Sequence, residues 1–400
     1  MDTNSTIYLV LLFIFLVLLF NRKLMNLESW RATMTPLASI IGSGFLISAP
    51  LLAHVGTNLA PYLMLGLCLI AFALGEIIRW NIAKIEPALE EESLSRKVRF
   101  FEKSSDWSLS LAYMLSITYY LYIFSSFVLR GTGLGSQGLE QITATCVFWA
   151  IALIGHQNGL DSIEKIEGMA VNLKLAIIAT FLVALAYFNY QQGSISLIPS
   201  GPQLEPHGIA TLLGLLIMVQ GFETSRYLGE KYSGELRIKS MRLAQLISMA
   251  IYFFFILLVM KVIDLHPIEG EISETSIIDI SKHVFSTGPL MLLFAAMASQ
   301  LSAAVADMAG SGGLIVELTH KKITSKNAYL IIAGVGTVLI WAFDIFQVIS
   351  FASKAFALYY LCQSLVSLCY HFKKNHFKTL FSLAGVILCL LVIFVGRSFE

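Results

Sequence analysis

Charged residues are scarce in this sequence. Only 13% of its 400 residues carry a charge, whereas 56% are hydrophobic, and the mean hydropathy is +0.75. A soluble domain of this composition would have too little polar surface to face water, but a protein that crosses a membrane many times needs little. The formal net charge of +1 gives no reason to expect a nucleic-acid partner. We therefore expect an all-α polytopic membrane protein embedded in the lipid bilayer.

Clusters of metal-ligating or catalytic residues are also missing. The five cysteines lie singly in apolar runs and form no CxxC pair, so we interpret them as small core residues. His54, His156 and His207 fall near the expected ends of spans, and no two of them have the spacing of metal ligands. A membrane-embedded transferase would need clustered His, Asp or Glu at one membrane face, and the acidic cluster Glu90–Glu92 has no histidine near it. The sequence therefore predicts no enzyme, no metal site and no organic cofactor.

Apolar runs long enough to cross a membrane recur along the whole chain. The first is short by the roughly twenty-residue rule. We interpret it as a retained helix rather than a signal peptide, because Asp2 to Thr6 supply no basic residue and no cleavage site of small residues follows Phe20. The longest connections are 81–106, 189–206 and 265–286. The twelve expected spans lie near 7–20, 35–54, 60–80, 107–130, 138–156, 166–188, 207–230, 243–264, 287–317, 327–343, 345–370 and 378–397.

Basic residues fall on alternate connections and predict the orientation. One set of connections is rich in lysine and arginine, whereas the other set is nearly free of them. Under the positive-inside rule the rich set faces the cytoplasm, which puts both termini on the extracytoplasmic side of the plasma (inner) membrane. The rich set contains Arg22, Lys23, Arg31, Lys84, Arg96, Lys97, Arg99, Lys103, Lys165, Lys231, Arg237, Lys239, Arg242, Lys321, Lys322, Lys326, Lys373, Lys374 and Lys378.

The stretch SIIGSGFLISAP, residues 39–50, interrupts the second expected span with small residues and a proline. A glycine holds a helix less well than alanine by roughly 1 kcal/mol. This stretch is therefore either an unwound part of a membrane helix or a place where Gly42 and Gly44 let another helix approach. The seventh expected span repeats the pattern with Gly221, Glu223 and Arg226 at membrane depth, where charges usually face a cavity or each other.

The two interruptions occupy matching places in two halves that cross the membrane in opposite directions. Gly42 and Gly221 are separated by nearly the same number of residues as Lys174 and Lys354. Two interrupted helices at corresponding positions of antiparallel halves indicate an inverted-repeat transporter.

Several segments resemble those of the amino acid–polyamine–organocation (APC) permeases. IIGSGFLISAPLLAHVG is similar to their first core helix, GLDSIEKIEGMAVNLKLAIIATFLVALA to their fifth, QGFETSRYLGEKYSGELRIKSMRLAQ to their sixth and QLSAAVADMAGSGGLIVEL to their eighth. The resemblance implies a LeuT-type fold of two inverted five-helix repeats, with discontinuous first and sixth core helices and the substrate site at the two breaks. It divides the single transporter domain, 1–400, into an extra N-terminal helix with its connection (6–33), a first repeat (34–188), a second repeat (207–370) and a peripheral C-terminal helix (371–400).

Both breaks suit a zwitterionic substrate. At the first, the amides of Ser43, Gly44 and Phe45 would begin the outer half-helix, and free N–H groups at a positive dipole end favour a carboxylate. At the second, carbonyl groups at Gly221–Thr224 would end the outer half-helix and favour an ammonium group. We therefore expect a substrate site formed by Ile41, Gly42, Ser43, Gly44, Phe45, Gly221, Phe222, Glu223 and Thr224.

The charged residues of the second break each have two interpretations. Glu223 contacts the substrate or, as the resemblance implies, braces the broken helix. Arg226 pairs with Glu223 at i,i+3, or it faces the cavity and makes an anion contact with an acidic substrate. Ile217 stands where the family often has an aromatic gate, which leaves Phe222 or Tyr119 as gate candidates.

Lys174 is the candidate coupling group. It either snorkels to the cytoplasmic surface or stays in the protein interior. In the family, a lysine at this place in proton-coupled or sodium-independent members occupies the volume that a sodium ion fills elsewhere, and a desolvated lysine can lose its proton. The resemblance places Ser302 and Asp307 of the eighth core helix across the same site. Asp307 would then pair with Lys174, although Arg226 or Lys354 could form the ion pair with Asp307 instead.

The sequence thus predicts a secondary active transporter that works by alternating access on an amino acid or a related small amine or organic acid. A proton or an exchanged solute would couple transport, and the alternative is sodium symport with Lys174 as a bystander. A passive channel is disfavoured, because two broken helices suit a site that binds and releases. The identity of the substrate, the direction of transport and the oligomeric state stay open, because side chains from several helices decide selectivity.

Overall fold

The structure, a computed structural model, describes residues 3–91, 94–133, 136–159, 164–193, 207–229, 231–267 and 275–397. Helices make up 88% of these described residues, and no strand occurs among them. The expected all-α class is therefore confirmed.

Nine helices of the described residues are long and apolar enough to cross a membrane. Several of them have a serine as the N-cap residue. The hydroxyl groups of Ser95, Ser136 and Ser233 each accept a hydrogen bond from a backbone N–H of the first turn. The nine are α5 (Ala60–Glu90), α6 (Arg96–Thr132), α7 (Gln137–Asn158), α8 (Glu164–Gln191), α10 (Gly234–Leu265), α12 (Gly288–Leu318), α13 (Ser325–Ala342), α14 (Ile345–His371) and α15 (His376–Val395).

Shorter elements form the other three expected spans. The first is α1 (Thr3–Leu19), and the second is the pair α3 (Glu28–Ser43) and α4 (Phe45–Gly56), which meet at an angle of 41°. The seventh consists of α9 (Gly208–Gly214) and two 3-10 helices, η2 (Leu216–Val219) and η3 (Phe222–Leu228). The small connecting helices are α2 (Arg22–Met25), η1 (Thr57–Leu59) and α11 (Ser276–Ser281).

The stretch 81–106 is helical at both ends, which differs from the long connection that its charge suggested. α5 continues to Glu90 and α6 begins at Arg96. Glu, Lys, Arg and Leu are good helix formers, so the two helices run on past their apolar parts. Low hydropathy marked the end of the expected spans, but it did not mark the end of the helices.

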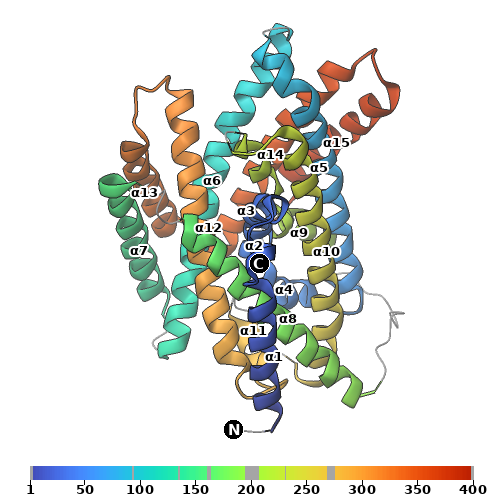
Figure 1. The fold of residues 1–400 in the computed structure, drawn as a ribbon, viewed down its shortest axis with the longest axis vertical. Helices are drawn as coiled ribbons and strands as arrows, with labels where there is room; N and C mark the ends of the chain where they lie inside the picture. Colours follow the sequence, from blue (N-terminus) through green and yellow to red (C-terminus); the bar gives the residue numbers. More distant parts are fainter. Residues whose placement is uncertain are drawn as a thin grey trace.

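Figure 1 shows the long helices running between two ends of the molecule, with the N terminus at the lower end. The connections α5–α6, α12–α13 and α14–α15 lie at the upper end, which we call the lysine-rich end. It carries Lys84, Arg96, Lys97, Lys321, Lys322, Lys326, Lys373, Lys374 and Lys378.

Central and peripheral helices are clearly separated. α6 packs extensively against α14 and α12, whereas α1 lies against α8, and α15 lies mainly against α14. Ser5 of α1 is hydrogen-bonded to Ser286 just before α12, with 2.7 Å between the hydroxyl oxygens. The first and last apolar helices thus lie at the edge of the bundle formed by the others. Their assignment as an extra N-terminal and a peripheral C-terminal helix stays a prediction.

Candidate functional site

The two broken spans pack against each other through glycines. A methyl group on Gly44, between α3 and α4, would lie 2.5 Å from the Cα of Met218 in η2. A methyl group on Gly221, between η2 and η3, would lie 2.5 Å from the hydroxyl of Ser39 and 2.7 Å from the backbone nitrogen of Ile40 in α3. Gly221 also has φ +115°, a backbone conformation that L side chains rarely adopt. Each break therefore leaves room only for the backbone of the other.

Tyr252 of α10 joins the two broken spans. Its hydroxyl lies 2.9 Å from the carbonyl oxygen of Ile40 and 2.7 Å from that of Met218, so it can donate to either. The side chain is fully buried. One phenol thus lies within hydrogen-bond distance of a backbone acceptor of each span, where regular helical bonding ends.

Other carbonyl groups near the end of α3 are bonded by side chains of α8 and α12. The ammonium group of Lys174 donates to the carbonyl of Ala38 at 2.7 Å and to the hydroxyl of Ser299 at 3.3 Å. The amide of Gln300 donates to the carbonyl of Gly42 at 2.9 Å. A cation at the C-terminal end of a helix is favourable, because the unsatisfied carbonyls there carry partial negative charge.

Lys174 is therefore an interior residue. Its side chain is 1% exposed, which shows that the snorkelling interpretation is wrong. Together with Ile41, Gly42 and Phe45 it lines a small cavity of about 20 Å³.

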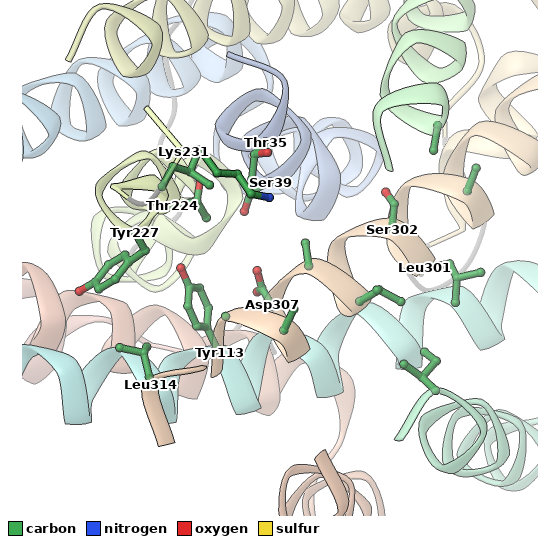
Figure 2. Close-up of a pocket in the computed structure, with 18 of the residues that line it drawn as sticks. Thr35, Ser39, Tyr113, Thr224, Tyr227, Lys231, Leu301, Ser302, Asp307 and Leu314 are labelled. Carbon is green, nitrogen blue, oxygen red and sulfur yellow. The ribbon is translucent and has the colours of Figure 1, made fainter. Parts of the chain in front are cut away.

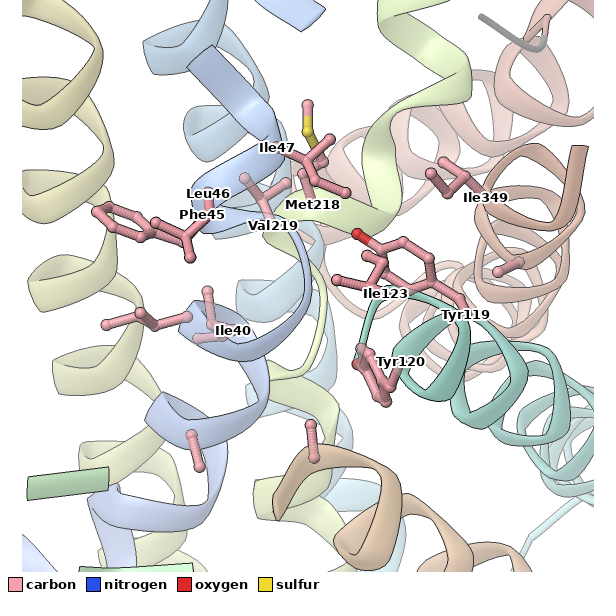
Figure 3. Close-up of a cluster of buried hydrophobic side chains, with 14 of the residues drawn as sticks. Ile40, Phe45, Leu46, Ile47, Tyr119, Tyr120, Ile123, Met218, Val219 and Ile349 are labelled. Atoms are coloured by element: carbon pink, nitrogen blue, oxygen red, sulfur yellow. The ribbon is translucent and has the colours of Figure 1, made fainter. Parts of the chain in front are cut away.

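A cluster of buried apolar side chains closes one side of the breaks (Figure 3). Most of it comes from α4, which follows the first break, and from η2, which precedes the second, together with α6 and α14. Ile40 of α3 also belongs to the cluster shown. All its members are at most 8% exposed. They include Phe45, Leu46, Ile47, Met218, Val219, Tyr119, Tyr120, Ile123 and Ile349, which we call the closing cluster.

A large cavity of about 630 Å³ lies on the other side of the breaks, toward the lysine-rich end. Its walls come from α3 before the first break, from η3 after the second, and from α6, α7, α8 and α12. Three of its lining residues, Ile154, Leu301 and Ala309, are also exposed at the surface of the protein. Its polar lining consists of Thr35, Ser39, Tyr113, Thr224, Tyr227, Lys231, Ser302 and Asp307.

Asp307 is the one carboxylate among the residues that line this cavity, and Lys231 is the one ammonium group. Figure 2 shows Asp307 on α12 and Tyr113 on α6 directed into the space below Thr224 and Ser39. The carboxylate of Asp307 accepts a hydrogen bond from the hydroxyl of Ser116 on α6. The cavity thus combines one buried carboxyl group with hydroxyl groups and aliphatic walls.

The expected site residues divide between the cavity and the packed breaks. Thr224, Ser302 and Asp307 line the large cavity. The reciprocal glycine contacts fill the space between the breaks, so the other expected residues there do not line it: Ile41, Gly42, Gly44, Phe45, Gly221 and Phe222. The side chains of Ser43 and Ile217 lie outside the described part of the chain.

Glu223 braces the second break. Its carboxylate accepts hydrogen bonds from the backbone N–H of Gly221 at 2.9 Å and from the hydroxyl of Tyr360 in α14 at 2.7 Å, and its side chain is fully buried. Phe222 stacks on the same tyrosine, with ring centroids 5.2 Å apart. These contacts fit the bracing interpretation of Glu223.

Arg226 makes its ion pairs elsewhere, so the expected i,i+3 pair with Glu223 is wrong. Its guanidinium pairs with Glu102 of α6, lies 3.5 Å from Glu86 of α5 and donates to the side chain of Gln363 in α14. Arg237 of α10 also binds Glu86, at 2.6 Å. Arg226 therefore ties η3 to three neighbouring helices and is absent from the cavity lining.

Lys174, on α8, contacts α12 at a different level from Asp307. Lys174 binds Ser299, and Asp307 follows two turns later, about 12 Å along a helix. The shared site expected for them is thus divided between the small cavity and the large one. Their roles in coupling stay predictions.

Five polar lining residues were missed by the sequence analysis, among them Lys231, which it treated only as a basic residue of a connection. Thr35 and Ser39 are four residues apart on α3, so both lie on one face of the helix. That spacing could have indicated a polar helix face at the site. Tyr113 and Tyr227 carried no comparable signal, because their position depends on how α6 and η3 pack.

The chain resembles known proteins over nearly its whole length. The sequence model of the APC superfamily transporters matches residues 22–396. A protein of Aquifex aeolicus (strain VF5), described as uncharacterized, is 41% identical over 400 residues, which cover 99% of this chain and 96% of that protein. A solved structure of a Na⁺-coupled sialic acid symporter, in a substrate-bound outward-open state, has a TM-score of 0.55 at 12% identity, over 98% of this chain and 99% of that one. The latter likeness shows a LeuT-like fold.

Proposed function

The chain belongs to the APC superfamily of transporters, and from this premise we propose that it is a secondary active transporter that works by alternating access. The observation that supports this most is the asymmetry about the breaks. A cavity of about 630 Å³ reaches them from the lysine-rich end, whereas the closing cluster fills the opposite side. A binding space open to one side only is the arrangement that a carrier needs and a passive channel lacks.

The proposed orientation follows from the positive-inside rule. The lysine-rich end faces the cytoplasm, so the cavity is open inward, and both termini are extracytoplasmic in the plasma (inner) membrane. Tyr119 in the closing cluster is then part of the outer gate.

The proposed substrate is an amino acid or a related small amine. Asp307 binds its ammonium group, because a carboxylate among aliphatic side chains attracts a cation strongly where little water screens it. Lys231 is a cation on the η3 side of the cavity for the carboxylate of a zwitterion. Thr224 and Ser302 offer hydroxyl groups, and the aliphatic walls accommodate an apolar side chain. The two packed breaks lie next to this proposed site and hold the helices that form it in place.

Lys174 is the proposed coupling residue. Its ammonium group bonds a carbonyl of α3 and a hydroxyl of α12, so loss of its proton would weaken the attachment of α3 to both helices. Proton coupling or exchange is therefore the proposal, and sodium symport is the alternative that the experiment must separate.

The first test is a thermal-shift screen of purified protein against amino acids, amines and small organic acids, with and without sodium. A ligand that binds the folded state raises the melting temperature by mass action. We expect a sodium-independent shift from a compound with an ammonium group, abolished in Asp307→Asn and retained in Asp264→Asn, which changes an exposed carboxylate at the end of α10. Counterflow of the labelled compound in proteoliposomes then identifies a carrier.

Each other outcome has a distinct meaning. A shift that requires sodium overturns the proposed coupling, and a shift that survives in Asp307→Asn overturns the proposed ammonium site. Binding without counterflow argues against a carrier.

A further inference from the structure

A group of lysines surrounds an aromatic cluster at the lysine-rich end, apart from the cavity. Lys373 and Lys374 lie in the connection between α14 and α15, and Lys378 lies in the first turn of α15. Lys84 follows Trp80 by one helical turn on α5 and so shares its face. We call Trp80 and these four lysines the Trp80 patch.

The lysine ammonium groups lie over aromatic rings. That of Lys378 is 4.9 Å from the ring centroid of Trp80, and that of Lys374 is 3.9 Å from the centroid of Tyr370. Lys373 is 5.9 Å from the ring of Phe372. These cation–π contacts hold flexible side chains in place, so the positive charges converge on one part of the surface.

Among the residues that the structure describes, no carboxylate neutralises the positive charge of the patch. None of its four lysines takes part in an ion pair with the carboxylates of the described residues. Other cations of the same end do, such as Arg237 with Glu86. The patch therefore has a charge that an external anion can complement.

Trp80 and the phenylalanines beside the patch indicate its depth in the membrane. Trp80 makes edge contacts with the rings of Phe377 and Phe381, with centroids 6.4 and 5.3 Å away. Phe377 is 69% exposed and Phe372 is 58% exposed, right beside the lysines. Tryptophan concentrates at the boundary between headgroups and acyl chains, where an aromatic body and a cation both find suitable surroundings. A soluble anion would contact only the lysines and leave the phenyl rings in water.

We propose that the Trp80 patch binds the phosphate group of an anionic phospholipid, such as phosphatidylglycerol or cardiolipin, while Phe372 and Phe377 contact its acyl chains. Lys84 of α5 and the lysines near α15 then share one headgroup. The bound lipid links the peripheral helix α15 to α5, with which it has few direct contacts.

The test compares two triple variants of the full chain in nanodiscs. Lys373→Gln/Lys374→Gln/Lys378→Gln removes charge from the patch, and Lys321→Gln/Lys322→Gln/Lys326→Gln removes the same charge from the α12–α13 connection at the same end. Native mass spectrometry counts bound phosphatidylglycerol, and a titration into phosphatidylcholine nanodiscs measures its affinity.

We expect the first variant to lose about 100-fold in affinity, because each lysine near an anionic headgroup contributes about a factor of five. The control variant should bind as the unmodified chain does, and binding should weaken as salt rises. Equal losses in both variants overturn the proposal, as does equal binding of phosphatidylglycerol and phosphatidylcholine. If soluble glycerol phosphate binds the chain as tightly as phosphatidylglycerol does, the patch is a free-anion site. If an acidic peptide binds but no lipid does, the patch is a site for a protein partner. Either result also overturns the proposal.

Discussion

Replacing Gly221 by alanine tests the reciprocal packing of the two broken spans. The added methyl group would lie 2.5 Å from the Ser39 hydroxyl and 2.7 Å from two backbone atoms of α3, which cannot move aside as a side-chain end can. Overpacking of this kind costs about 1–3 kcal/mol. The φ of +115° adds about 1–3 kcal/mol for a residue with a Cβ. The expected loss of stability is therefore about 2–6 kcal/mol.

Two further alanine variants calibrate this result. Gly44→Ala meets the backbone of Met218 at 2.5 Å but has an ordinary φ of −109°, so we expect only the overpacking cost. Gly66→Ala lies inside α5 with nothing within 4 Å of its methyl group, and it should stabilise the helix by about 0.5–1 kcal/mol.

The assay is thermal unfolding of the three variants in one detergent at one scan rate, because unfolding of such proteins is often irreversible. We expect the melting temperatures to rank Gly66→Ala highest, then the unmodified chain, then Gly44→Ala, then Gly221→Ala. If Gly221→Ala melts with the unmodified chain, or if Gly66→Ala falls as far, the breaks do not pack as described.

Three more predictions concern charged groups. Arg226→Leu should destabilise the protein by about 3–5 kcal/mol by leaving Glu102 buried without its partner, and adding Glu102→Gln should recover much of the loss, as a double-mutant cycle of melting temperatures would reveal. Lys174→Met should abolish the pH dependence of ligand-induced thermal shifts if its proton couples transport; an unchanged pH profile would refute that role. Partial burial and the stacked ring of His266, 3.9 Å away, lower the pKa of His283. Its neutral form is thus favoured by folding, so stability falls as the pH drops through the range where histidine titrates, and His266→Gln should shift the NMR titration of His283 to higher pH.

The fold could be expected from the sequence, because the membrane restricts the options. Each span must satisfy its own backbone, so apolar length, alternating basic connections and two interruptions already imply the number and direction of the spans. The places where expectation and structure differ are helix ends. α5 continues to Glu90 and α6 begins already at Arg96, in polar stretches where hydropathy does not report on helix formation. The boundaries assigned to the two repeats stay predictions.

The candidate site was harder to foresee, because its residues meet only through tertiary packing. Glycine and charge at membrane depth correctly drew attention to both breaks. The sequence alone could not show that each glycine receives the other span's backbone and so leaves no space for a ligand there. Arg226 likewise had a plausible partner three residues away, yet its partners come from α5 and α6, more than a hundred residues earlier in the chain.

Accessibility of two cysteines tests the central claim that the cavity is open at the lysine-rich end and closed beyond the breaks. In a background without the five native cysteines, Ala309→Cys places a thiol in the cavity, and Ile349→Cys places one in the closing cluster. Membrane-impermeant maleimides are added to oriented vesicles from either side. We predict that the thiol at position 309 reacts only from the side of the lysine-rich end, and that the thiol at position 349 reacts from neither side. Modification at position 349 from the opposite side, with position 309 protected, would contradict this account.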